Sequence, residues 1–345
     1  MSELSDSYLP RDMRNNRIRC KKCILDSATP GIILNPATGL CQYCEQEPVV
    51  VPKSEELHQI LNGSRGKKEF DAIFALSGGK DSCYTLHHLK NLYPDLRILA
   101  VQFDNGFISN IAVNNAKRFC RMTESTYLSL TTDPVILSTA FRRAAESTNG
   151  YPLISRIRAS DICNTCIGIV KQKLLGLALI HQAPLVVFAF SPGQTTNPYI
   201  RLNLSSIQWF RNLFQKELQA IGVTNCDELL IGKDLLTQVA PKFELIMAHP
   251  LLIWDYDKKR IEQECIDLGW RYPDLGDRNS TNCLLNAYAI DNHIKKYGIH
   301  PYAFDLAALV RGGHLSREEA ISSVDADLSP TLIRYARDKL QITLK

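Results

Sequence analysis

The chain has 345 residues, of which 45% are hydrophobic and 22% are charged, with a formal net charge of +4. This is ordinary globular composition, and the length allows two domains plus a smaller appendage. No apolar run reaches the roughly 18 residues of a membrane span, and the polar start of the chain is not typical of a signal peptide. The small positive charge permits a nucleic-acid partner without arguing for one. We therefore expect a cytoplasmic protein with no membrane segment.

Eleven cysteines in a reducing compartment indicate metal or redox chemistry rather than a disulfide framework. Cys20 and Cys23 form one C-x2-C pair, Cys41 and Cys44 form another, and seventeen residues separate the two pairs. Four thiolates complete a tetrahedral Zn²⁺ site and leave no position open for catalysis. Two disulfides or four unrelated thiols are the competing interpretations. We predict a structural zinc ribbon over residues 1–50.

Residues 51–250 begin with a helix predicted from Ser54 to Leu61 and then alternate between apolar strands and helices. Strands are predicted at Ala72–Leu76, Ile98–Phe103, Thr126–Leu130 and Leu185–Phe190, and helices between them at Ser82–Leu92, Asn110–Thr123 and Cys166–His181. This alternation predicts an α/β domain with a doubly wound parallel sheet. Ligand loops should then lie at the carboxyl ends of the strands.

Residues 251–345 have a helical pattern and form the predicted C-terminal helical region. Helices are expected at Lys258–Leu268, Asn286–Tyr297, Pro301–Arg311, Arg317–Val324 and Thr331–Leu340. Ser316 and Glu319 have the spacing of a capping box, which predicts where one of these helices begins.

The first predicted strand runs into the sequence Ser-Gly-Gly-Lys-Asp-Ser at residues 77–82 and then into a helical pattern. Paired glycines let backbone N–H groups approach phosphate oxygens, and the start of a helix adds a positive partial charge. The order differs from that of a Walker A loop. We predict a phosphate-binding loop, with an ordinary Gly-Gly turn as the alternative.

A third C-x2-C pair, Cys163 and Cys166, lies at the predicted start of a helix, where the helix dipole favours the thiolate. The residues are compatible with a redox dithiol, a second zinc site, two core thiols or part of an iron–sulfur site. Cys283 lies in a polar stretch, where a merely buried cysteine is less expected.

The loop at residues 77–82 resembles the PP-loop of the ATP pyrophosphatases, which cleave ATP between the α and β phosphates and adenylate a substrate oxygen. Together with the ribbon, the later C-x2-C pair and a remote third cysteine, it is similar to the tRNA 2-thiolation enzymes and related sulfur transferases. This resemblance implies a 4Fe–4S cluster held by Cys163, Cys166 and Cys283, with the remaining iron holding the sulfur to be transferred. The C-terminal region must then fold back over the sheet. A dithiol at Cys163 and Cys166 that relays persulfide or forms a disulfide is the alternative.

For the nucleotide we expect the phosphates to be bound by backbone and hydroxyl groups of Ser77, Gly78, Gly79 and Ser82. Lys80 would stabilise the leaving pyrophosphate and Asp81 would bind Mg²⁺. At the ends of the second and fourth strands, Asp104 and Gly193 are expected to meet the nucleotide, with a turn aspartate and an ordinary loop glycine as the alternatives.

The loop after the fourth strand, Ser-Pro-Gly-Gln at residues 191–194, lacks the acidic residue that many thiolation relatives carry there. Asp81 or Asp104 would then bind the magnesium without that acid, or Asp255 or Asp277 would replace it. This departure also weakens the case for tRNA as the acceptor and makes a small molecule at least as plausible.

The ribbon, the turn at residues 104–107 and, loosely, the tail at residues 313–320 are also similar to the N-acetyl sugar amidotransferases, which receive ammonia from a separate glutaminase subunit. We therefore expect an ATP-dependent sulfur transferase and keep an ammonia-using amidotransferase as the alternative. A non-catalytic, nucleic-acid-binding ribbon protein is disfavoured by the intact loop. The implied partners are a small-molecule or RNA acceptor and a sulfur donor or a glutaminase, and a homodimer is compatible with this scheme.

Overall fold

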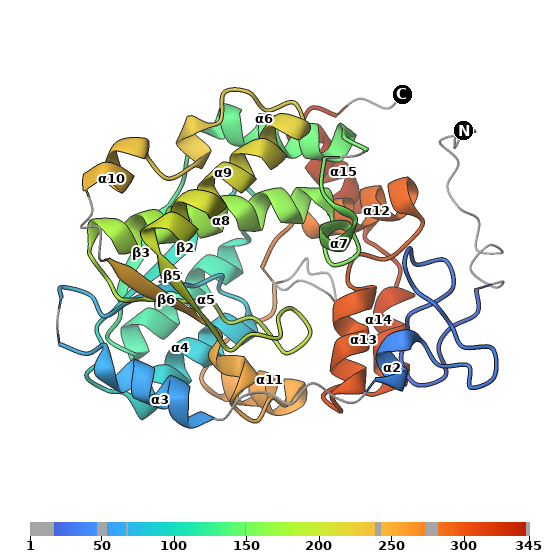
Figure 1. Cartoon of the computed structure of the whole chain (residues 1–345), viewed down its shortest axis with the longest axis horizontal. Helices are drawn as coiled ribbons and strands as arrows, with labels where there is room; N and C mark the ends of the chain where they lie inside the picture. The colour runs from blue at the N-terminus through green and yellow to red at the C-terminus, as the bar shows by residue number, and fades with distance from the viewer. Residues whose placement is uncertain are drawn as a thin grey trace.

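The computed structural model describes residues 17–46, 54–66, 68–148, 150–238, 243–273 and 282–342. At its centre lies a six-stranded sheet in the order β3-β2-β1-β4-β6-β5 (Figure 1). The strands are β1 Ala72–Ala75, β2 Ile98–Phe103, β3 Thr126–Leu130, β4 Leu185–Val187, β5 Tyr199–Asn203 and β6 Glu244–Ala248. All neighbouring strands are parallel except β5, which is antiparallel to β6. The predicted α/β fold with a doubly wound parallel sheet is confirmed, with the antiparallel edge strand β5 as an addition.

The helices of the amino-terminal two thirds are α2 Gln42–Glu45, α3 Ser54–Gly63, α4 Lys80–Leu92, α5 Asn110–Met122, α6 Pro134–Glu146, α7 Leu153–Arg156, α8 Asp161–Ile180, α9 Leu204–Ala220 and α10 Lys233–Gln238. The carboxyl-terminal third contains α11 Lys258–Asp267, α12 Asn286–Tyr297, α13 Ala303–Arg311, α14 Arg317–Val324 and α15 Pro330–Lys339. The capping box predicted at Ser316 and Glu319 is present at the start of α14.

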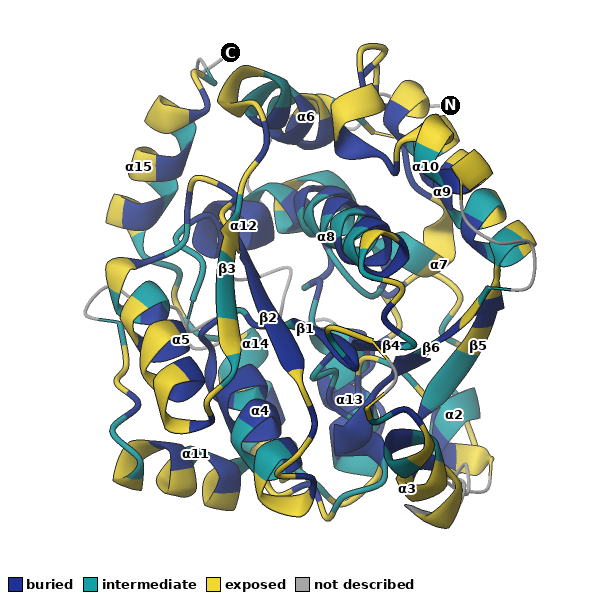
Figure 2. Cartoon of the chain, turned by 90° about the vertical axis from the view of Figure 1, so that its left-hand side faces the viewer, coloured by how far each residue is buried: buried dark blue, intermediate teal, exposed yellow. Residues whose placement is uncertain are grey.

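Alternate residues of the central strands pack on opposite faces of the sheet. Ile73 and Val186 belong to the apolar cluster that includes α8, whereas Phe74 and Leu185 belong to the cluster that includes α4. Burial on both faces explains why these strands are continuous apolar runs in the sequence. Figure 2 shows the central strands in the colour of buried residues and the outer faces of α5, α11 and α15 in the colour of exposed ones.

Helix α8 is long and apolar enough to cross a membrane by length and composition, and it is the one such helix among the described residues. Half of its apolar window is buried inside the protein. The helix packs against β1 and β4 of the sheet and against α6 and α9. In this fold it is therefore a core helix.

The ribbon packs on the C-terminal helices (Figure 1). The ring of Tyr43 meets that of Phe304 on α13 edge to face, with the ring centroids 5.2 Å apart. Arg317 on α14 donates hydrogen bonds of 3.1 Å to the carbonyl oxygens of Cys20 and Cys23. The ribbon cysteines, the α4 side of the sheet and helices α11, α13 and α14 share one apolar cluster. The core thus runs across the sequence boundaries predicted near residues 50 and 250.

Candidate active site

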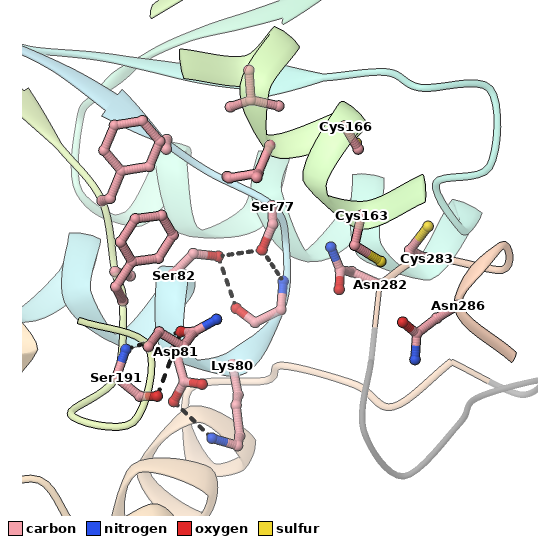
Figure 3. A pocket seen from close by; sticks show the side chains of 18 of the residues that line it. Ser77, Lys80, Asp81, Ser82, Cys163, Cys166, Ser191, Asn282, Cys283 and Asn286 are labelled. Carbon is pink, nitrogen blue, oxygen red and sulfur yellow. Dashed lines mark hydrogen bonds and ion pairs between the residues drawn. The ribbon is translucent and has the colours of Figure 1, made fainter. Parts of the chain in front are cut away.

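A cavity of about 460 Å³ opens at the carboxyl ends of β1 and β4. This is the edge of a doubly wound sheet where ligands are expected to bind, beside the point at which the strand order reverses. Its walls come from five segments: the loop after β1, the turn after β2, the start of α8, the loop after β4, and the C-terminal region around residues 256–258, 282–289 and 302–309 (Figure 3). The predicted phosphate loop and the three predicted cluster cysteines all line it.

The loop after β1 owes its shape to backbone packing at Gly78. This glycine has φ +79°, and a Cβ on it would lie 2.1 Å from the carbonyl oxygen of Ala112 in α5. Its own carbonyl oxygen accepts a hydrogen bond of 3.0 Å from Nε1 of Trp270. Gly78 therefore anchors the loop through its packing on α5 and Trp270, whereas Ser77, Gly79 and Lys80 line the cavity.

The polar side chains of the loop form a preorganised set (Figure 3). The hydroxyls of Ser77 and Ser82 lie 3.0 Å apart, and Ser82 donates to the carbonyl oxygen of Gly79 at 2.9 Å. Nζ of Lys80 lies 2.6 Å from Oδ1 of Asp81, and Lys80 is only 8% exposed. A largely desolvated ammonium interacts more strongly with an oxyanion than a solvated one does, which suits it to phosphate binding.

Two further groups at this loop were missed by the sequence interpretation, Tyr256 and Lys258, which come from the segment leading into α11. Burial lowers the pKa of Lys258, and the positive charge of Lys80 nearby lowers it further. Burial also raises the pKa of Tyr256, with the Asp81 carboxylate adding to the effect. Two lysines, Lys80 and Lys258, therefore line the cavity. They lie far apart in the chain, so no local spacing could have revealed the pair.

The three cysteines predicted to act together are brought together. Ser160 caps α8 by accepting from the N–H of Cys163, and this places Cys163 and Cys166 on the first turns of the helix. The segment around Cys283 pairs with the turn after β2 through an antiparallel bridge between Ile108 and Cys283. Figure 3 shows Cys163 and Cys283 directed toward one another at the cavity. The predicted fold-back of the C-terminal region is present.

A single amide links two of these thiols. Nδ2 of Asn105 lies 3.6 Å from Sγ of Cys166 and 3.6 Å from Sγ of Cys283, so the two sulfurs are at most twice that distance apart. Burial raises the pKa of Cys166 to about 12, and the neighbouring thiols of Cys283 and Cys163 contribute. The expectation that the helix dipole would make this thiol easier to ionise is therefore wrong for Cys166, because desolvation outweighs it.

Three thiols at one cavity are suited to an iron centre, which displaces thiol protons as it binds. Three ligands on a 4Fe–4S cluster leave one iron without a protein thiolate. The donor set and its position at the cavity fit such a cluster, and Cys163, Cys166 and Cys283 are the residues that would hold it.

Two residues predicted to contact the nucleotide, Asp104 and Gly193, lie outside the cavity lining. Asp104 is exposed, accepts a hydrogen bond of 2.8 Å from the N–H of Gly106, and lies outside the cavity lining, where its neighbour Asn105 is found. It therefore has the geometry of the alternative, a turn aspartate. A Cβ on Gly193 would lie 2.4 Å from the carbonyl oxygen of Asp305, so this glycine permits close packing of the loop after β4 on α13.

Of the two acids considered as magnesium ligands, Asp255 pairs with Arg260 at 2.9 Å and its side chain is 86% exposed, while Asp277 lies outside the described residues. The cavity instead receives a carboxyl from α13. Asp305 lines it, and its Oδ1 is buried without a hydrogen-bond partner among the described residues. Burial raises the pKa of Asp305 to about 7, while the guanidinium of Arg158 works in the opposite direction.

The ribbon forms a closed four-sulfur site. The sulfurs of Cys20, Cys23, Cys41 and Cys44 all lie within 4.8 Å of one another, and all four residues are buried. Sγ of Cys23 and Sγ of Cys41 are 3.6 Å apart, close to the spacing of two ligands in a tetrahedral zinc–thiolate site with bonds of about 2.3 Å. The residues therefore fit Zn²⁺, and no disulfide links them.

The thiol pKa values explain why a cation suits this site. Burial raises the pKa of Cys20, but backbone hydrogen bonds outweigh it and lower the value to about 7. Burial raises the pKa of Cys23 to about 11, and the neighbouring Cys41 adds to the shift. Four thiolates at this spacing repel one another, so a bound dication would stabilise them together.

No protein-family model matches the chain. An uncharacterized protein of Methanocaldococcus jannaschii is 25% identical over 328 residues, covering 91% of this chain and 95% of that relative. Among solved structures, the U34-tRNA thiolase NcsA from Methanococcus maripaludis with its 4Fe–4S cluster is 15% identical, with a TM-score of 0.36, and the match covers 95% of this chain and 89% of that one. NMN synthetase from Francisella tularensis is 12% identical, with a TM-score of 0.37, covering 85% and 96%.

The protein class is defined by this chain's own features. A mainly parallel sheet ends its first strand in the sequence Ser-Gly-Gly-Lys-Asp-Ser, that loop opens a helix, and the cavity lies at the carboxyl ends of β1 and β4. These features agree with the resemblance of the loop to the PP-loop of the ATP pyrophosphatases.

Proposed function

We propose that the protein is an ATP-dependent sulfur transferase. It adenylates a carbonyl or hydroxyl oxygen of its acceptor and then replaces that oxygen with sulfur. The observation that carries the proposal is that one cavity is lined both by the phosphate loop and by three cysteines from two distant segments. A nucleotide site with a dedicated sulfur site beside it is what adenylation followed by sulfur attack requires.

In the first half-reaction the acceptor oxygen attacks the α-phosphorus of ATP, and the bond to the β-phosphate breaks. Backbone N–H groups at the start of α4 and the hydroxyls of Ser77 and Ser82 would bind the departing pyrophosphate. Lys80 and Lys258 would neutralise the charge that develops on it, which is the electrostatic contribution that usually dominates such transfers. Asp81 would hold Mg²⁺ on the phosphates.

In the second half-reaction sulfur, supplied at the oxidation level of sulfide, attacks the adenylated carbon, and AMP leaves with the original oxygen. A 4Fe–4S cluster held by Cys163, Cys166 and Cys283 would supply an iron free to hold that sulfur. Apolar side chains of the cavity wall, among them Phe188 and Ile162, would exclude water that could otherwise hydrolyse the adenylate.

The ammonia-using amidotransferase shares the first half-reaction and differs in the incoming nucleophile. Its support is the similarity of the ribbon, and of the turn at residues 104–107, to enzymes that act on N-acetyl sugars. Under that function the three cavity cysteines would have no chemical step to perform. Their convergence at the nucleotide loop therefore favours sulfur transfer.

The first half-reaction is tested with Mg-ATP, total tRNA or nucleotide-linked N-acetyl sugars as acceptor, and sulfide or ammonium as donor. Turnover should yield AMP and pyrophosphate, whereas ADP and phosphate would exclude the assignment. Lys80→Ala should lower the rate of pyrophosphate release by about 10²–10³-fold, as loss of one preorganised group commonly does. Lys90→Ala on the same helix, remote from the loop, is the matched control.

The nucleophile is tested by anaerobic reconstitution with ferrous iron and sulfide. The wild-type protein should take up a 4Fe–4S cluster, and Cys283→Ala should lose it and lose sulfur incorporation while binding ATP normally. Cys226→Ala, at a buried cysteine outside the cavity lining, is the control. Nitrogen incorporation from ammonium that survives in Cys283→Ala would instead identify the amidotransferase.

A further inference from the structure

Asn105 is the buried polar residue that connects the cysteine segments. It is the second residue after β2, is 5% exposed and lines the cavity. Its Oδ1 accepts a hydrogen bond of 2.9 Å from the N–H of Phe107, which fixes the orientation of the amide. Nδ2 is thereby aimed at Sγ of Cys166 and Sγ of Cys283, at 3.6 Å from each.

The same turn also positions one of the two thiols. The N–H of Ser109 donates to the carbonyl oxygen of Asn282 at 3.0 Å, and the N–H of Leu284 donates to that of Phe107 at 2.8 Å. These bonds flank the bridge between Ile108 and Cys283. Because one short segment presents the Asn105 amide and anchors the Cys283 backbone, the amide and this thiol keep a fixed relation to each other.

We propose that Asn105 is a positioning residue of the sulfur site, whose amide hydrogens donate one to each of two cluster thiolates and raise the reduction potential of the bound 4Fe–4S cluster. This inference rests on the proposed function, because it requires the cluster. An N–H···S hydrogen bond withdraws electron density from the thiolate and so stabilises the more negative, reduced cluster. The side-chain amide has two such hydrogens and no charge of its own.

A neighbouring asparagine shows what an ordinary structural amide does in this region. Asn164 lies between Cys163 and Cys166 on α8, and its Nδ2 donates to the backbone carbonyl oxygens of Ser155 and Ala159 at 3.2 and 3.1 Å. Backbone carbonyls are the usual partners of a buried amide. The amide of Asn105 is instead directed at two cysteine sulfurs, which are the proposed cluster ligands.

The experiment compares Asn105→Asp with the wild-type protein and with Asn164→Ala, each reconstituted anaerobically with ferrous iron and sulfide. Asn105→Asp keeps the oxygen that accepts from Phe107 and so keeps the turn, but an ionised carboxylate has no hydrogen to donate. Iron content, the cluster EPR signal and a dye-mediated redox titration are measured. Thermal unfolding of the metal-free proteins checks that each variant folds, and Asn105→Ser serves if Asn105→Asp does not.

We expect Asn105→Asp to have a clearly lower reduction potential and to lose iron faster on dilution than the wild-type protein. Asn164→Ala loosens the start of α8 without removing a donor to sulfur, so its potential should match that of the wild type even if its cluster is less stable. Equal potentials in Asn105→Asp and the wild type would overturn the role of Asn105 alone. A wild-type protein that takes up no cluster would overturn the sulfur-transferase proposal and this inference with it.

Discussion

In the ribbon, four buried cysteine sulfurs lie within 4.8 Å of one another, and backbone hydrogen bonds such as that from the N–H of Cys20 to the carbonyl oxygen of Leu25 surround them. In the cavity, three cysteines are each partly exposed and come from segments far apart in the chain. Each region has one C-x2-C pair at the start of a helix, Cys41 and Cys44 at α2 and Cys163 and Cys166 at α8. The ribbon closes its site with a second pair nearby, whereas the cavity completes its set with one distant thiol and leaves room for a ligand.

This difference is the one expected between a structural metal site and the sulfur site that we propose. A metal with four protein ligands can stabilise a fold but has no position left for substrate. A metal centre held by the three cavity thiols would keep a position open. In the cavity, Oδ1 of Asp305 is buried without a hydrogen-bond partner among the described residues, whereas in the ribbon Arg317 donates to the carbonyl oxygens of Cys20 and Cys23.

The largest expected effect follows from removing one ligand of each site in turn. Cys41→Ser should lose zinc and unfold the ribbon, because metal binding contributes on the order of 10 kcal/mol to the folding of such small modules. Cys283→Ser should lose the cluster yet change the free energy of unfolding by no more than ~1 kcal/mol. Zinc and iron contents and thermal unfolding are measured for both. Equal losses of stability in the two variants would show that the cavity cysteines contribute to folding as much as the ribbon cysteines do.

A smaller effect should appear as a pH dependence at Asp305. Its folded-state pKa of about 7 lies above the ordinary aspartate value of 3.8, so folding favours the protonated carboxyl. The stability that this provides is present below pH ~4 and is lost as the pH rises through ~7, by at most about 4 kcal/mol. Asp305→Asn, which stays neutral, should therefore be more stable than the wild type at pH ~8, with a smaller advantage at pH ~5.5.

The measurement is the unfolding midpoint of both proteins in denaturant across that pH range without nucleotide. A stability advantage of Asp305→Asn that stays constant with pH would mean that the pKa of Asp305 is the same in the folded and unfolded protein. The cavity would then not differ from the ribbon in holding an unpartnered polar group. Asp255→Asn is the matched control, because Asp255 is exposed and paired with Arg260.

The smallest effect concerns the contact between the ribbon and α14. Arg317→Ala removes two charge-assisted hydrogen bonds to the carbonyl oxygens of Cys20 and Cys23 and should cost about 1–3 kcal/mol. The four thiols are untouched, so the zinc content should stay the same. Arg19→Ala, which breaks a more exposed pair with Asp325, should cost less than ~1 kcal/mol. Zinc loss in Arg317→Ala would show that the ribbon needs its docking surface in order to hold the metal.

The sequence interpretation was most accurate where the signal is carried by consecutive residues. The strands β2 and β3 have the predicted bounds, and the loop at residues 77–82 lies between a strand and a helix as predicted. Strands β5 and β6 were missed. β5 lies at an antiparallel edge and is interrupted by Arg201, and β6 begins with Glu244, so neither is an uninterrupted apolar run like a central parallel strand.

The sequence by itself determined two local features, the four-cysteine cluster of the ribbon and the loop at residues 77–82, because both depend on spacing along the chain. Two C-x2-C pairs specify a four-sulfur cluster, and paired glycines between a strand and a helix specify the loop at residues 77–82. Only the tertiary structure decided what surrounds that loop. Lys258, Asp305, Cys283 and Asn105 reach the cavity from four separate segments, and their contacts depend on how the C-terminal region packs over the sheet. Burial then set the pKa values of Cys166 and Asp305, because desolvation depends on neighbours in space rather than in sequence.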